Sequence, residues 1–349
     1  MNNKRIIWID YLKVLAILGV LGIHCSSILL DNKYFFSNAW IESVVCSSLF
    51  RFAIILFVMA SGYLLLRKDQ PIEIIPHRIR RILIPFLFWF IIYVIIKVIF
   101  TDVLGPSWTI INFLSYLFSG FLNPLNVSVQ FWYVYMILGL YLMSPIISKW
   151  IQNAKVVDIE YFLLLWALVS LLRFMNVDTI IVDYLRYFSG SIGYFVLGYY
   201  LTIKKHELLT NKKFGILLFI IGTLITVCGT IILSVICSSQ SLFFIRLGDI
   251  TPGACLQAVG LFILVKNIDY SLINQKINDF ITNISRDSYG IYLVNILVLN
   301  FLEKIHILNF MKYTTLSIIC AIIIVMTISM VIVELFNKVP ILQPFSGRG

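Results

Sequence analysis

The chain alternates between long apolar runs and short polar segments, the pattern of a protein that crosses a membrane several times. Ten runs predict helices, and most are long enough to cross about 30 Å of hydrocarbon. They cover residues 6–30, 40–66, 82–100, 129–147, 159–175, 189–203, 214–236, 243–265, 280–301 and 316–335. We therefore expect an all-α polytopic membrane protein with about ten transmembrane helices, of which 189–203 is the shortest.

The longest loop on the predicted outer side, residues 101–128, contains no Lys or Arg. It includes a partly apolar stretch from Trp108 to Phe121. This stretch predicts an interfacial or re-entrant helix on the outer face.

Composition supports a membrane protein, because 60% of the residues are hydrophobic, 13% are charged and the mean hydropathy is +0.96. The net charge of +10 could suggest a nucleic-acid partner. Most Lys and Arg residues fall in alternate loops, however, as the positive-inside rule requires. This pattern predicts that both termini are cytoplasmic and removes the reason to expect nucleic-acid binding. We expect one membrane domain, residues 1–336, followed by a short cytoplasmic tail, residues 337–349.

The six cysteines lie within or at the edges of apolar runs, and none has a C-x-x-C spacing. They predict neither a disulfide framework nor a metal site. Of the four histidines, only His24 lies deep in an apolar run, which also argues against a metal.

Three ionisable residues share one side of the first predicted helix. At about 100° per residue, the eleven positions from Lys13 to His24 return to within about 20° of the same direction, and Asp10 precedes Lys13 by about one turn. Ionisable groups inside a membrane indicate a functional site, with Asp10 and Lys13 paired and His24 available as a base. The alternative is that Asp10 and Lys13 are interfacial residues and His24 a hydrogen-bonded packing residue.

A second charged cluster precedes the third run and contains His77, Arg78, Arg80 and Arg81. Arg78 and Arg81 are three positions apart, so they project from one helix face and could hold one phosphate or pyrophosphate between them. The alternative is that this cluster only orients the protein in the membrane.

These clusters resemble the membrane-bound acyltransferase 3 family, whose members O-acylate extracytoplasmic glycans and related acceptors. The first span of that family has an acidic residue followed by Arg-x10-His, which corresponds here to Asp10, Lys13 and His24. Further similar stretches follow in family order: Ser61-Gly62-Tyr63, Arg78-x-x-Arg81 before Pro85, Phe131 to Pro145, Gly193 to Tyr200, and Ser288 to Leu293.

The chain departs from the family pattern at three positions. Lys13 replaces the arginine of the first span and keeps its charge but not its planar fork. Gln130 and Asn295 stand where the family often has histidine, and an amide cannot relay a proton near pH 7. His24 is then the strongest base candidate within the predicted membrane spans.

The resemblance implies an O-acetyltransferase with acetyl-CoA as donor, no metal, and an extracytoplasmic glycan or cell-envelope acceptor. Arg78 and Arg81, assisted by Arg80 or His77, would bind the phosphates of cytosolic CoA. His24 would act as general base or carry the acyl group, while Asp10 and Lys13 assist. The remaining substrate or cavity candidates are Arg51, Trp132, Tyr292 and Asn295.

The apolar runs predict location in a cell membrane and contact with lipids, and the many Ile, Lys and Asn residues favour a bacterial plasma membrane. We also expect a separate envelope partner protein. Two other functions stay open. Intramembrane charges also occur in transporters, and the departures at Lys13, Gln130 and Asn295 would fit a relative that assists glycan assembly or export without acyl transfer.

Overall fold

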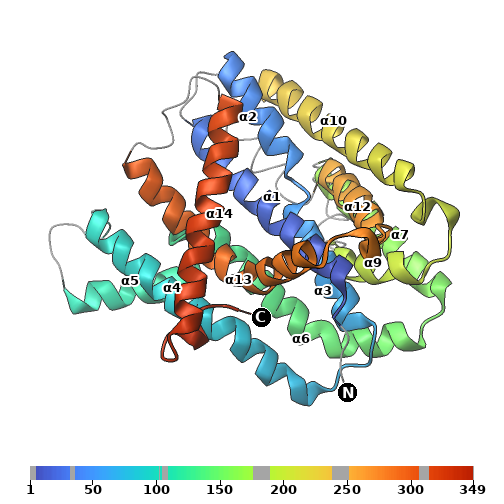
Figure 1. Cartoon of the computed structure of the whole chain (residues 1–349), viewed down its shortest axis with the longest axis horizontal. Helices are drawn as coiled ribbons and strands as arrows, with labels where there is room; N and C mark the ends of the chain where they lie inside the picture. The colour runs from blue at the N-terminus through green and yellow to red at the C-terminus, as the bar shows by residue number, and fades with distance from the viewer. Residues whose placement is uncertain are drawn as a thin grey trace. The chain divides into compact units, whose positions relative to one another are not determined.

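The computed structural model of the chain describes residues 5–31, 36–101, 103, 109–175, 189–237, 251–305 and 314–348. These residues form helices joined by turns, with no β-strand among them (Figure 1). The all-α prediction is therefore confirmed for the described part of the chain.

The chain forms two compact units. Unit 1 comprises Met1–Ile72, Met143–Ser285 and Met311–Ile322, and unit 2 comprises Glu73–Leu142, Arg286–Phe310 and Ile323–Gly349. The helices of unit 1 are α1 (Ile7–Asp31), α2 (Asn38–Leu49), α3 (Ala53–Leu66), α7 (Val156–Phe174), α9 (Ser191–Ile203), α10 (Lys212–Cys237) and α12 (Pro252–Lys266). The helices α4 (Ile75–Phe100) and α5 (Ile110–Leu122) belong to unit 2, while α6 (Trp132–Asn153), α13 (Gln275–Lys304) and α14 (Thr314–Lys338) contribute residues to both.

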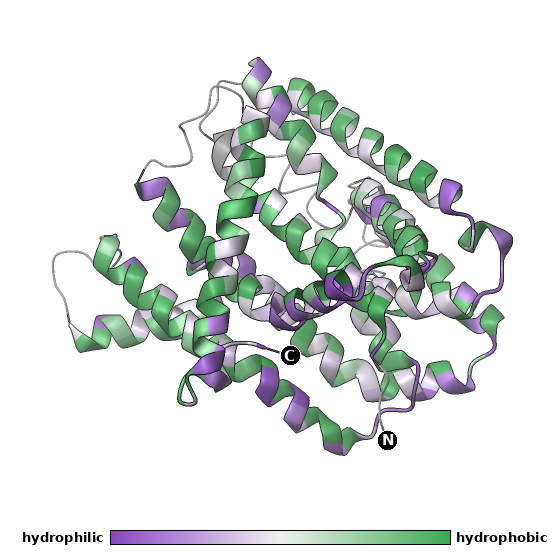
Figure 2. Ribbon diagram, viewed as in Figure 1, coloured by the Kyte–Doolittle hydropathy of each residue, from purple (hydrophilic) through white to green (hydrophobic). Residues whose placement is uncertain are grey.

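Within the described part of the chain, six helical segments are long and apolar enough to cross a membrane. They are Ile7–Ser27, Asn38–Leu66, Ile72–Phe100, Val129–Asn153, Lys212–Ile236 and Thr314–Lys338. Most of α10 is hydrophobic (Figure 2). Its Leu224 and Ile232 side chains are exposed, as expected of a surface in contact with lipid.

The predicted number of ten spans is not confirmed. Three apolar helices, α5, α9 and α12, have only 10 to 17 residues. The helices α7 and α13 form at the predicted places but contain charged residues, including Glu160 in α7 and Asp287 in α13. Part of the predicted 243–265 run lies outside the described residues, and the orientation of the termini stays a prediction.

Side-chain caps explain where several helices begin. The Ser37 hydroxyl accepts from the backbone N–H of Trp40 at the start of α2, at 3.2 Å. Thr109 does the same for Asn112 at the start of α5, at 3.1 Å, and Thr251 for Ala254 at the start of α12, at 3.1 Å. Such caps satisfy backbone donors that have no partner within the helix. A helix forms where the stretch 108–121 predicted one, as α5, while Trp108 lies outside the described residues and the interfacial or re-entrant position stays a prediction.

Small residues let the helices of unit 1 approach closely. Helix α10 lies beside α12 (Figure 1), and a Cβ added at Gly222 would lie 2.5 Å from the Gly253 carbonyl oxygen. A Cβ added at Gly62 of α3 would lie 1.8 Å from the Phe195 carbonyl oxygen of α9. Close backbone packing at glycine is a common way of joining helices in a membrane.

In unit 2, the segment after α14 folds back onto α4 and α13. The Phe345 ring stacks on Phe88 with centroids 4.6 Å apart, and the indole N–H of Trp89 donates to the Phe345 carbonyl at 3.0 Å. Arg348 pairs with Asp287 at 3.1 Å. The predicted tail is therefore an ordered, docked segment, while the predicted boundary at residues 336 and 337 stays a prediction.

Candidate functional site

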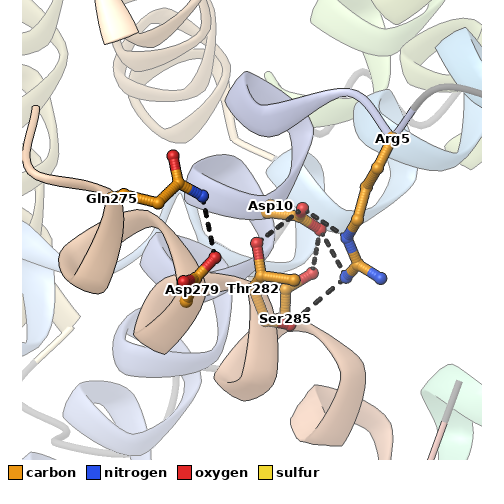
Figure 3. A network of polar contacts seen from close by, with 6 residues as sticks. All are labelled: Arg5, Asp10, Gln275, Asp279, Thr282 and Ser285. Atoms are coloured by element: carbon orange, nitrogen blue, oxygen red, sulfur yellow. Dashed lines mark hydrogen bonds and ion pairs between the residues drawn. The ribbon is translucent and has the colours of Figure 1, made fainter. Parts of the chain in front are cut away.

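Asp10 is the centre of a polar network at the start of α1 (Figure 3). The Asp10 side chain is only 5% exposed, and its carboxylate accepts two hydrogen bonds from the Arg5 guanidinium, at 2.7 and 2.9 Å. The Ser285 and Thr282 hydroxyls of α13 also donate to it, at 2.6 and 3.4 Å. Asp10 therefore joins α1 to α13, and its place in the first turn of α1 also suits the positive end of the helix dipole.

Arg5 is a partner that the sequence pattern did not indicate. It precedes the first helical residue, Ile7, so helical periodicity could not place its side chain. Its guanidinium also donates to the Thr282 carbonyl at 3.2 Å. Lys13 lies half-buried on α1, and its predicted pairing with Asp10 stays a prediction.

We expect Asp10→Asn to lower the free energy of unfolding by about 1.5–3 kcal/mol, the range for a hydrogen bond to a charged group. In this variant the Arg5 guanidinium loses the carboxylate that accepts two hydrogen bonds from it, but the Arg5 side chain is 38% exposed and water can hydrate it instead. Thermal unfolding of the purified protein in detergent measures the change. The matched control is Asp279→Asn, because the exposed Asp279 carboxylate accepts only from the nearby Gln275 amide among the contacts drawn in Figure 3. Equal stability of the two variants would contradict the anchoring role.

His24 lies on α1 with a half-buried side chain. Its imidazole interacts electrostatically with the guanidinium of Arg51, which lies between α2 and α3. Arg51 is 6% exposed and donates to the Ser47 hydroxyl at 2.9 Å. Unit 1 thus brings together a base and a buried cation, and the sequence pattern did not associate these two residues.

Arg78, Arg80 and Arg81 lie in the first turns of α4, in unit 2. Arg78 is half-buried, while Arg80 and Arg81 are exposed. The hydroxyl of Tyr141, from α6, interacts electrostatically with both Arg78 and Arg81. Tyr141 therefore lies near both arginines, while their joint contact with one phosphate group stays a prediction.

Trp132, Tyr292 and Asn295 belong to a second part of unit 2. Trp132 is half-buried and lies edge-on to the Tyr133 ring. The Tyr133 ring lies 5.0 Å from that of Tyr292, whose hydroxyl donates to the Gln130 carbonyl. The Asn295 amide donates to the Tyr292 carbonyl at 2.6 Å. Tyr292 therefore lies beside Gln130 and Asn295, two of the three positions at which the chain departs from the family pattern, and Trp132 is linked to it through Tyr133.

Tyr93 is a residue of this region that the sequence pattern missed. Its hydroxyl accepts from the Leu297 backbone N–H at 2.8 Å and donates to the Leu293 carbonyl at 3.1 Å. The hydroxyl is thus inserted into the hydrogen-bond ladder of α13, around Asn295. An inserted side chain is one of the known causes of a bend in a long helix.

Among the described residues, no group of three or more His, Cys, Asp or Glu side chains could hold a metal ion.

The long apolar helices, which could span a bilayer, define a membrane protein. A family model described as an acyltransferase domain matches residues 6–335, and the chain belongs to this family, the acyltransferase 3 family. No curated protein and no solved structure matches the chain significantly. The family resemblance deduced from the sequence motifs is therefore confirmed, and the protein is a membrane acyltransferase.

Proposed function

We propose that the protein transfers an acetyl group from cytosolic acetyl-CoA to a hydroxyl of an extracytoplasmic glycan or another cell-envelope acceptor, in a bacterial plasma membrane. The family match over residues 6–335 carries this proposal. The excess of Lys and Arg in the loops on the side of the N-terminus supports a cytoplasmic donor side. Membrane lipids surround the apolar helices, and a separate envelope protein could present the acceptor.

Arg78 and Arg81 bind the phosphates of the donor in this proposal, with Arg80 or His77 assisting. CoA carries several phosphate charges, and an arginine fork can donate two parallel hydrogen bonds to one phosphate. Their common neighbour Tyr141 supports a shared binding face.

His24 performs the proton transfer. The imidazole takes the proton of the acceptor hydroxyl while the hydroxyl oxygen attacks the thioester carbonyl carbon. Alternatively, His24 attacks the thioester itself and carries the acetyl group to the acceptor. Lys13, on the same side of α1, assists by stabilising negative charge or contacting CoA. Asp10 has a positioning role, because its network fixes the start of α1.

We expect Arg78→Ala/Arg81→Ala to raise the dissociation constant of acetyl-CoA about 100-fold, since each lost charged hydrogen bond costs about 1.5 kcal/mol. Equilibrium binding of radiolabelled acetyl-CoA to the purified protein measures this constant. Arg67→Ala/Lys68→Ala removes two charges from the adjoining segment and is the matched control, with an expected change below about twofold. Equal weakening by both double variants would show a general charge effect and contradict a phosphate site.

A non-catalytic role in glycan assembly or export is the second candidate, favoured by Lys13, Gln130 and Asn295 at positions where the family has basic or titratable residues. A transporter is a further alternative. Substrate flux without an acetylated product would support the transporter, whereas acetyl-CoA binding with acyl transfer would exclude both alternatives.

A further inference from the structure

The segment Asn38–Leu66 is apolar and long enough to cross a membrane, but it is not one continuous helix. Helix α2 ends at Leu49 and α3 begins at Ala53. No glycine or proline occurs at residues 50–52, so local sequence preference does not explain the interruption. Interrupted helices within a membrane protein are tolerated where the backbone is satisfied by protein or lines a cavity, and they often form binding sites.

Contacts from neighbouring helices hold this interruption in place. The Gln257 amide of α12 is fully buried and donates to the Ser48 carbonyl at 2.8 Å, and to the Thr223 hydroxyl at 2.8 Å. The Gln257 side-chain oxygen is buried and has no hydrogen-bond partner among the described residues. The break therefore brings hydrogen-bonding groups from α2, α10 and α12 to one place in unit 1.

Helix α1 packs directly on the interrupted residues. A Cβ added at Gly22 would lie 2.2 Å from the Phe50 ring, and one added at Gly19 would lie 2.9 Å from the Ala53 Cβ. His24 is two residues beyond Gly22, so the break and the imidazole lie at a similar height along α1. The guanidinium of Arg51 therefore lies near enough to His24 to interact with it electrostatically.

Arg51 is buried at this point, and the Ser47 hydroxyl, one turn earlier, accepts from its guanidinium. A buried guanidinium stabilises negative charge more strongly than an exposed one, because water screens it less. Acetyl thioester and hydroxyl acceptor are both neutral at the reacting atoms before the reaction. Negative charge develops only on the carbonyl oxygen, when the tetrahedral intermediate forms.

From this geometry we propose that Arg51 is a catalytic residue that binds the oxyanion of the tetrahedral intermediate, with Ser47 positioning its guanidinium. This inference rests on the proposed acetyl transfer. As His24 takes the acceptor proton, the new C–O bond forms and the carbonyl π electrons move to the oxygen beside Arg51. Collapse of the oxyanion breaks the C–S bond, and His24 returns the proton to the CoA thiolate. If His24 carries the acetyl group, the same oxyanion forms twice and Arg51 acts on both.

The test is single-turnover cleavage of the thioester by purified protein that is saturated with acetyl-CoA and mixed with cell-envelope material, which supplies the acceptor hydroxyl, together with the acetyl-CoA dissociation constant. We expect Arg51→Gln to slow cleavage about 10²–10³-fold, the usual loss for one oxyanion donor, and to leave the dissociation constant within about twofold. Arg51→Lys keeps the charge and should recover about tenfold of that loss. The matched control is Arg173→Gln, since Arg173 is exposed and donates to Ser189 at 2.7 Å, and it should cleave at the wild-type rate.

Ser47→Ala tests the same role if Arg51→Gln does not fold, and it should slow cleavage about threefold to tenfold. Wild-type cleavage by either Arg51→Gln or Ser47→Ala would overturn the inference while leaving the acetyltransferase proposal intact. A rise of the acetyl-CoA dissociation constant in proportion to the lost rate would also overturn it, because Arg51 would then bind the donor in its ground state. If the wild-type protein neither binds nor cleaves acetyl-CoA, the proposed function itself fails.

Discussion

Replacing His24 with alanine is expected to lower the rate of acetyl transfer about 10²–10⁴-fold, the contribution of a well-placed general base. Of the described histidines, only His24 and His77 lie in helices that are long and apolar enough to cross a membrane. His77 is in the first turn of α4. The His24→Ala protein should still bind acetyl-CoA, because the proposed phosphate ligands lie on α4. Initial rates of transfer in membranes with equal amounts of each variant measure the effect.

The control for this variant is His206→Ala. His206 is exposed and lies in a turn, where its ring nitrogen accepts from the Leu208 backbone N–H at 3.3 Å. Wild-type transfer by His206→Ala and near-complete loss in His24→Ala is the expected pair of results. Retention of more than about a tenth of the wild-type rate by His24→Ala would contradict a role as base or acyl carrier.

Gly62→Val is expected to lower the free energy of unfolding by about 3 kcal/mol or more, the upper part of the range for an overpacked core. The added Cβ would overlap the Phe195 carbonyl oxygen of α9, which belongs to the backbone and cannot turn aside. The reverse contact is also too close for a side chain, because a Cβ at Gly198 would lie 2.1 Å from the Met59 carbonyl oxygen of α3. The two helices would therefore have to separate.

Thermal unfolding in detergent, followed by size-exclusion chromatography of the heated sample, measures this loss. Gly139→Val is the matched control, since among the described residues nothing beyond its own stretch of helix lies within 4 Å of a Cβ added at Gly139 of α6. Its midpoint should stay near that of the wild type. A Gly62→Val protein as stable as Gly139→Val would contradict the close α3 and α9 packing.

The pattern of apolar runs predicted the helices well because hydrocarbon requires long apolar segments with internal hydrogen bonds. Helix α10 (Lys212–Cys237) closely follows the predicted run 214–236, and α14 (Thr314–Lys338) extends the run 316–335. The number of spans was harder to predict. Periodicity cannot separate a short buried helix such as α9 from a helix that crosses a membrane.

The candidate site also depends on contacts between segments that are far apart in the sequence, and periodicity does not predict such contacts. Sequence spacing placed Asp10 and His24 on α1, but the hydroxyl partners of Asp10 come from α13, more than 270 positions away. The run 40–66 gave no sign of the interruption at Arg51, since it contains no glycine or proline at residues 50–52. Tertiary contacts, such as Gln257 with the Ser48 carbonyl, stabilise that break, and local preference cannot predict them.

The most direct test of the proposed function follows radiolabelled acetyl groups from acetyl-CoA into cell-envelope material, in membranes with and without the protein. The proposal predicts label in base-labile esters of envelope glycans or related acceptors only when the wild-type protein is present. If those membranes gain no label above the protein-free control, and the purified protein does not bind acetyl-CoA, the proposed acetyltransferase function is contradicted.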